Sequence, residues 1–242
     1  MSVKTTTYYP KLVNVKEAVT ALKDVVTVTP LLQNNNYSRQ FDASILLKRE
    51  DLQQVRSYKI RGAYNKISSL STEELRNGIV CASAGNHAQG VAFACHKLQI
   101  HGTIFMPTPT PKQKLEQVKM FGGEFITVKL VGDTFDDAQN EAKRECDVLQ
   151  KTFVHPFNDP KIIEGQATVG LEIIEQFSEP IDYVFVPVGG GGLASGLSSV
   201  FKLLSPPTKI IGVEPFGAPS MKSAFEKGEN VRLEKIEKFS ET

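Results

Sequence analysis

Short apolar runs rich in β-branched residues recur along the chain, and a helical pattern follows most of them. The runs cover 45–48, 79–82, 102–106, 124–128, 183–188 and 209–213. Strands that are apolar on both faces and alternate with helices are typical of parallel sheets covered by helices. The pattern therefore predicts an α/β protein.

Between these runs, polar and glycine-containing stretches predict three helices, at 110–120, 133–150 and 160–177. Asp133, Asp136 and Asp137 open the second of them, and we interpret these aspartates as helix caps rather than metal ligands. Asn34-Asn35-Asn36 is predicted to be a turn.

The distribution of strands favours two sheets. Residues 72–155 form a complete βαβαβα run, whereas the strand at 45–48 and those after 180 must pair elsewhere. We therefore expect two three-layer domains with parallel or mixed sheets. A small domain, 72–155, is inserted in a large one built from 1–71 and 156–242.

Composition excludes several classes of function. The chain has 242 residues, with 28 Lys and Arg against 27 Asp and Glu, so no overall field attracts nucleic acid or an anionic membrane. No stretch approaches the roughly 18 apolar residues of a spanning helix, and no apolar leader opens the chain. Cys81, Cys95 and Cys146 lack metal-binding or disulfide spacing and are expected to be reduced, buried thiols. A cytoplasmic protein that binds small molecules is predicted.

Lys59 is the main candidate for covalent chemistry. It follows Ser57, which is expected to cap a helix beginning near Lys59. The positive end of the helix dipole disfavours an ammonium and lowers the lysine pKa toward the neutral amine that imine formation needs. Arg56 and Arg61 add positive charge nearby, unless Arg61 only pairs with a carboxylate. A solvated surface lysine remains the alternative.

A polar turn follows the strand at 79–82 and opens a helix of small residues. Its backbone N–H groups and the Ser83 hydroxyl can bind an anion such as a substrate carboxylate. The alternative is an ordinary turn capped by Ser83 or Asn86. His87 is either a general base or a hydrogen-bonded core residue.

A run of four glycines, Gly189–Gly192, lies between the apolar run at 183–188 and a helix. Consecutive glycine N–H groups at a helix start can surround a phosphate. The spacing excludes a Walker loop, and a dinucleotide fingerprint is disfavoured because Glu214 is the only acidic residue near the expected distance. A purely structural glycine turn stays open at this point.

Taken together and in this order, the motifs resemble those of the fold-type II pyridoxal-phosphate enzymes, which share the architecture of the tryptophan synthase β subunit. Within that group the chain is most similar to the threonine dehydratase (threonine ammonia-lyase) family. The motifs that carry the resemblance are residues 57–63, 83–90, 106–107, 156–159, 165–168 and 189–193.

The resemblance implies roles for individual residues. Lys59 is expected to bind the cofactor aldehyde as an imine and Asn86 to contact the pyridoxal 3′-oxygen. The phosphate is expected on the backbone N–H groups of Gly189, Gly190, Gly191, Gly192 and Leu193. The substrate carboxylate is expected among Ser83, Ala84, Gly85 and His87, with Lys59 and Ser83 as the catalytic residues.

The implied reaction is β-elimination from L-threonine. The substrate amine displaces Lys59, Lys59 takes the α-proton and the β-hydroxyl leaves. The enamine product then tautomerises and is hydrolysed by water to 2-oxobutanoate and ammonia, the entry to isoleucine biosynthesis. Serine dehydratase or serine racemase activity is the alternative within the family. The resemblance also implies a homo-oligomer, as a dimer or tetramer.

Two departures from the family pattern stand out. Relatives in the serine racemase branch bind a divalent cation with two carboxylates and a backbone carbonyl, whereas here Ser220 replaces one carboxylate. Only Glu214 and the Ala218 carbonyl remain for a weak site. Family members also continue well beyond Thr242, so we expect an incomplete large domain with uncovered apolar surface. A truncated, non-catalytic paralogue is therefore a second hypothesis.

Overall fold

The protein is described here by a computed structural model that covers residues 8–231 and 233. Its helices are α1 (Leu12–Leu22), α2 (Asn35–Phe41), α3 (Lys59–Ser68), α4 (Thr72–Leu75), α5 (Asn86–Leu98), α6 (Lys112–Gly122), α7 (Phe135–Leu149), α8 (Pro160–Gln176), α9 (Gly192–Leu204) and α10 (Ser220–Lys227). Its strands are β1 (Leu31–Gln33), β2 (Leu46–Lys48), β3 (Ile79–Ala82), β4 (Gly102–Met106), β5 (Ile126–Leu130), β6 (Thr152–Phe153), β7 (Tyr183–Pro187) and β8 (Lys209–Val213). Short 3-10 turns are formed by η1 (Glu50–Leu52) and η2 (Gly123–Phe125).

The strands form three sheets in the described part of the chain. A parallel four-stranded sheet has the order β5-β4-β3-β6, β7 pairs in parallel with β8, and β1 pairs antiparallel with β2. The prediction of an α/β protein with parallel sheets is confirmed. The run at 124–128 is shifted, because η2 occupies its first residues and the strand begins at Ile126.

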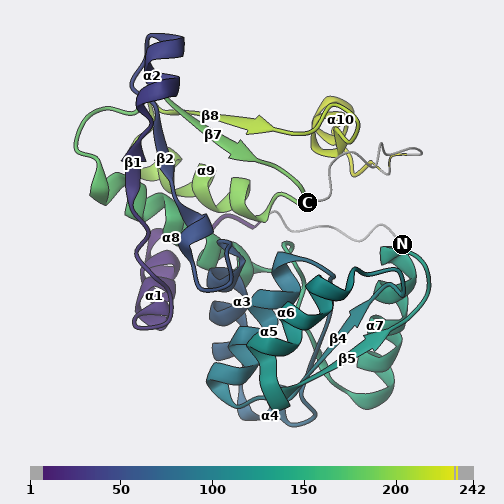
Figure 1. Ribbon diagram of the computed structural model, residues 1–242. Helices are drawn as coiled ribbons and strands as arrows, with labels where there is room; N and C mark the ends of the chain where they lie inside the picture. Colours follow the sequence, from purple (N-terminus) through teal and green to yellow (C-terminus); the bar gives the residue numbers. More distant parts are fainter. Residues whose placement is uncertain (1–7, 232, 234–242) are drawn as a thin grey trace.

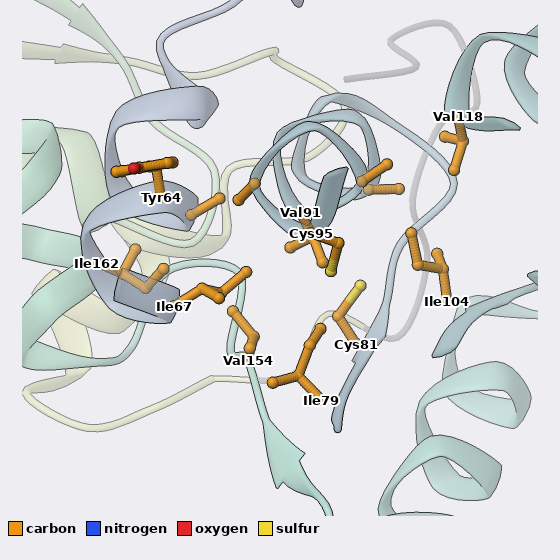
Figure 2. Packing of buried hydrophobic residues seen from close by; sticks show 14 of the residues in the cluster. Tyr64, Ile67, Ile79, Cys81, Val91, Cys95, Ile104, Val118, Val154 and Ile162 are labelled. Carbon is orange, nitrogen blue, oxygen red and sulfur yellow. The ribbon is translucent and has the colours of Figure 1, made fainter. Parts of the chain in front are cut away.

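The four-stranded sheet is the middle layer of three. Ile79 and Cys81 of β3 pack into a large core with α3, α5 and α6 (Figure 2). Val80 and Ala82 point to the opposite face and pack against Ala138 of α7. Successive residues of a strand face opposite sides of a sheet, so an all-apolar strand is buried on both.

A continuous layer of helices connects this sheet to the β7–β8 sheet. α5 packs against α3, α3 against α8, and α8 against α9, which in turn contacts β7 and β8 (Figure 1). Glycines permit the close approach of α3 and α8: a Cβ on Gly165 would lie 2.7 Å from the Cα of Gly62. Lys59 begins α3 and so lies within this helical layer.

In the described part of the chain, one face of the β7–β8 sheet carries exposed apolar side chains. Val186 points toward α9 and is buried. Phe185 and Val213 belong to the other face and remain 68% and 50% exposed. Among the described residues, none of the helices is both long and apolar enough to cross a bilayer.

Two local predictions were wrong, and a third, on the caps of α7, was right only for Asp137. Asn34 is the N-cap of α2, so the asparagines open a helix rather than form only a turn. α7 is capped by Thr134, not by Asp133, in a capping box completed by the Asp137 side chain. Ser57 does not cap α3, because Tyr58 takes that position. The buried Ser57 hydroxyl has no hydrogen-bond partner among the described residues.

Candidate active site

The sheet order marks one edge of the molecule as the place for a ligand. From β3 the chain proceeds to β4 and β5 on one side, and it returns to β6 on the other side of β3. In open parallel sheets, ligands bind beyond the carboxyl ends of the strands at such a reversal. The segments that follow β3 and β6 are residues 83–87 and 154–157.

Lys59 points its amine toward the second of these segments. Its Nζ donates a hydrogen bond to the carbonyl oxygen of Pro156 at 2.8 Å. Burial lowers the pKa of Lys59 to about 8, because desolvation penalises the ammonium. The predicted direction is confirmed, although the cause is burial rather than the helix dipole.

The helix that carries Lys59 is tightly held. A Cβ on Gly90 of α5 would lie 3.0 Å from the carbonyl oxygen of Lys59, so α3 and α5 approach closely where Gly90 has no side chain. Arg61, which is 1% exposed, pairs with Glu50 at 2.8 Å and with Glu172 at 2.6 Å. Lys48 also pairs with Glu172, so two cations and two carboxylates balance in this buried cluster. Arg61 therefore pairs with carboxylates, the simpler of the two roles considered for it.

The turn after β3 leaves the start of α5 uncapped by side chains. Gly85 is the N-cap residue, and neither Ser83 nor Asn86 makes a capping hydrogen bond. The Ser83 hydroxyl instead accepts a hydrogen bond from the Gly85 N–H at 3.2 Å, and Ala84 is half-buried beside it. Asn86 is exposed at the first helical position. The first N–H groups of α5 are thus available to an anion.

His87 lies behind this turn as a neutral, buried ring. Its Nε2 lies 3.1 Å from the carbonyl oxygen of Val154, so this nitrogen carries the proton and donates it. Burial, followed by the charge of Lys59, lowers the pKa of His87 to about 3. Its Nδ1 is buried and has no hydrogen-bond partner within the part of the chain that the structure describes. This geometry favours the core role of His87 over that of general base.

The glycine run forms the turn that opens α9. Gly191 is the N-cap residue with φ +85°, a conformation that side chains disfavour. A Cβ on Gly190 would lie 2.1 Å from the Phe157 ring, and a Cβ on Gly192 would lie 3.1 Å from the same residue. Gly189 is exposed with open space around it, and Leu193 is buried in the first turn of the helix. The lack of a side chain at Gly190 thus makes room for the Phe157 ring.

The segment after β6 contacts all three motifs that are separate in the sequence: the start of α3, the turn after β3 and the glycine turn. Val154 contacts His87, Pro156 contacts Lys59, and Phe157 packs against the glycine turn. The sequence identified 156–159 only as a family motif and gave these residues no role. An explicit prediction of the strand order would have placed them at the site.

The arrangement fits a phosphorylated aldehyde. An amine with a lowered pKa can condense with an aldehyde, and the glycine turn at the start of a 13-residue helix suits a phosphate. Glu214, considered as a weak metal ligand with Ala218, instead accepts hydrogen bonds from the N–H groups of Met221 and Lys222 at 2.8 Å each. Its carboxylate caps α10.

A family profile described as "Pyridoxal-phosphate dependent enzyme" matches residues 22–242, nearly the whole chain. The chain belongs to the pyridoxal-phosphate dependent enzymes. The fit of the site to an aldehyde phosphate agrees with this family. The dinucleotide interpretation of the glycine run is thereby replaced.

Several relatives in this family carry threonine dehydratase names. The chain is 57% identical to L-threonine dehydratase biosynthetic IlvA of Halalkalibacterium halodurans, over 90% of this chain and 52% of that protein. It is 51% identical to the protein of the same name from Bacillus subtilis, over 94% of this chain and 55% of that protein. It thus spans about half the length of these curated relatives.

Solved structures of the same family superpose closely. The processed form of threonine deaminase isoform 2 from Solanum lycopersicum matches with a TM-score of 0.87 and 41% identity, over 97% of this chain and 65% of that one. Maize serine racemase matches with a TM-score of 0.89 and 31% identity, over 95% of this chain and 69% of that one. The pyridoxal-phosphate enzyme fold is therefore established for this chain.

Proposed function

We propose that the chain carries the active site of a pyridoxal-phosphate dependent L-threonine dehydratase, which converts L-threonine to 2-oxobutanoate and ammonia in isoleucine biosynthesis. The observation that carries the proposal is the link from the Lys59 amine, through Pro156 and Phe157, to the glycine turn. The choice of threonine is supported by the names of the relatives that share about half of its residues, which are biosynthetic threonine dehydratases.

Lys59 is proposed as the residue that binds the cofactor and moves the α-proton. At pH 7 a pKa of about 8 leaves roughly one amine in ten neutral, compared with about three in ten thousand for a lysine at its ordinary pKa of 10.5. Burial therefore increases the nucleophilic form about 300-fold. When bound, the cofactor supplies the electron sink that acidifies the α-carbon.

We assign the binding of the phosphate, the pyridoxal oxygen and the substrate carboxylate to the glycine turn and to the turn after β3. The N–H groups of Gly189–Gly192 and Leu193 are proposed to hold the phosphate, and Asn86 to contact the pyridoxal oxygen. Residues Ser83–Gly85 and the start of α5 are proposed to hold the substrate carboxylate, assisted by the Ser83 hydroxyl. For His87, only its backbone N–H suits an anion, because the free Nδ1 presents a lone pair.

The domain boundaries, the cellular location and the assembly of the protein are also part of the proposal. The four-stranded sheet lies entirely between residues 79 and 153, which supports a small domain at 72–155 inserted between 1–71 and 156–242. A cytoplasmic location and a homo-oligomeric assembly are likewise proposed, by likeness to the family.

The test measures 2-oxo acid release from L-threonine by the purified chain with pyridoxal phosphate, alongside Lys59→Ala. The proposal predicts 2-oxobutanoate from the wild type and none above background from the variant. Faster pyruvate release from L-serine would favour the serine-specific alternative, which the similarity to maize serine racemase supports. No turnover of either substrate would favour a non-catalytic role.

A further inference from the structure

The turn at residues 155–158 holds the atom that binds the Lys59 amine, and it is itself closed by a side chain. The Nδ1 atom of His155 accepts hydrogen bonds from the backbone N–H groups of Phe157 at 3.2 Å and Asn158 at 2.8 Å. A backbone N–H only donates, so Nδ1 must carry a lone pair and no proton. The neutral imidazole therefore closes the turn.

Closing the turn fixes two contacts at once. Pro156, in the middle of the turn, directs its carbonyl oxygen to the Lys59 Nζ at 2.8 Å. The next residue, Phe157, places its ring where a Cβ on Gly190 would lie 2.1 Å away. The His155 ring also packs edge-on against Phe157, with 4.6 Å between the ring centroids and 89° between the planes.

We propose that His155 is a positioning residue, whose unprotonated Nδ1 sets the turn that aligns the Lys59 amine with the glycine turn. The inference rests on the proposed role of Lys59 and names a residue outside the set assigned above. His155 acts only through Pro156 and Phe157, so its removal changes the alignment of two binding elements rather than the chemistry of either.

Burial is the main effect that favours the neutral form of the His155 ring. Burial lowers its pKa, as do Lys143 of α7 and Lys59 of α3, whereas Asp159 at the start of α8 raises it. The Asp159 carboxylate is already engaged by the Lys161 N–H at 2.8 Å and by Lys66 at 2.9 Å. Protonation of Nδ1 would set an N–H against two backbone N–H groups and open the turn.

Two substitutions of His155 separate the hydrogen-bond acceptor at Nδ1 from the packing of the ring against Phe157. His155→Phe keeps an aromatic ring against Phe157 but has no acceptor. His155→Asn loses the ring, yet its side-chain oxygen can accept from the N–H groups two and three residues ahead, as asparagine does in turns. The full chain is incubated with pyridoxal phosphate and cyanoborohydride, and the adduct on Lys59 is quantified by peptide mass spectrometry.

The expected result is an approximately tenfold lower rate of adduct formation on Lys59 in His155→Phe and near wild-type rates in His155→Asn. Labelling of Lys59 by a small neutral acylating reagent, normalised to the exposed Lys16, should change less than about threefold in both. A circular dichroism melt checks that each variant is folded. Wild-type adduct rates in a folded His155→Phe, or no rescue in a folded His155→Asn, would overturn the proposal.

A pH profile distinguishes positioning from a merely structural role. The ratio of the adduct rate in His155→Asn to that in the wild type should rise as the pH falls below the ordinary pKa of histidine, because only the wild type has a titrating group at this position and burial lowers its pKa. A flat ratio contradicts the inference and leaves the proposed function intact. A wild type that forms no adduct on Lys59 overturns both.

Discussion

Arg61 holds the first turn of α3, and its removal should cost a large share of the stability of the protein. Its guanidinium, 1% exposed, donates to Glu50 at 2.8 Å twice and to Glu172 at 2.6 and 2.9 Å. Arg61→Leu leaves Glu50 without a cation and Glu172 with Lys48 alone. Breaking a buried pair in this way costs about 3–5 kcal/mol.

Urea unfolding of Arg61→Leu measures this cost. With a slope of about 2.5 kcal/mol/M, a reasonable value for a chain of this size, the midpoint should fall by roughly 1–2 M. Arg76→Leu is the matched control, because Arg76 is 73% exposed, pairs with Glu73 at 3.7 Å, and should shift the free energy of unfolding by less than about 0.5 kcal/mol.

A second variant tests whether the buried charge is the cause. Adding Glu50→Gln to Arg61→Leu removes one unpaired carboxylate and leaves Lys48 paired with Glu172. Part of the lost stability should return. Equal midpoints for Arg61→Leu and Arg76→Leu would refute the view that this cluster anchors α3. A double variant less stable than Arg61→Leu would refute the electrostatic explanation.

Three further predictions concern packing, titration and thiol reactivity. Gly165→Ala should lower the free energy of unfolding by about 1–3 kcal/mol, because the new Cβ would lie 2.7 Å from the Arg61 carbonyl oxygen. Gly170→Ala should lower it less, because that Cβ would lie 3.2 Å from the Val200 side chain. Equal losses in urea unfolding would contradict this. The folded pKa of Lys59 lies below its unfolded value, so burial of its amine costs stability below pH 8 and the cost fades toward pH 10.5. Lys59→Met should therefore be more stable at pH 7, by at most about 3 kcal/mol, and a gain independent of pH would argue against the lowered pKa. A thiol reagent should modify the half-buried Cys146 before the buried Cys81 in the native protein, and mapping of the labelled peptides checks the order.

The sequence predicted those parts of the fold that depend on periodicity within one segment. The runs at 79–82 and 102–106 became strands β3 and β4 with the expected bounds, because a strand buried on both faces leaves a continuous apolar signature. The run at 209–213 also became strand β8 with the expected bounds, although most of its residues are exposed. Thr134 was missed as a cap although Thr134 and Asp137 carry the spacing of a capping box.

The parts that could not be predicted depend on contacts between distant residues. The hydrogen bond from Lys59 to Pro156 joins positions 97 residues apart, and it exists only because β6 returns beside β3. For the same reason the sequence assigned the lowered pKa of Lys59 to a local helix dipole, whereas burial by the surrounding elements causes it. Cys146 was expected to be buried and is only half-buried, with its Sγ donating to the Lys151 carbonyl oxygen.

The proposed function depends on the Lys59 amine as the covalent attachment point for pyridoxal phosphate. The most direct test is borohydride reduction of the chain after incubation with the cofactor, followed by peptide mass spectrometry and comparison with Lys59→Ala. The account predicts a single phosphopyridoxyl group on the peptide that contains Lys59, and none at any site in the variant. A label spread over exposed lysines, or retained in Lys59→Ala, would contradict it.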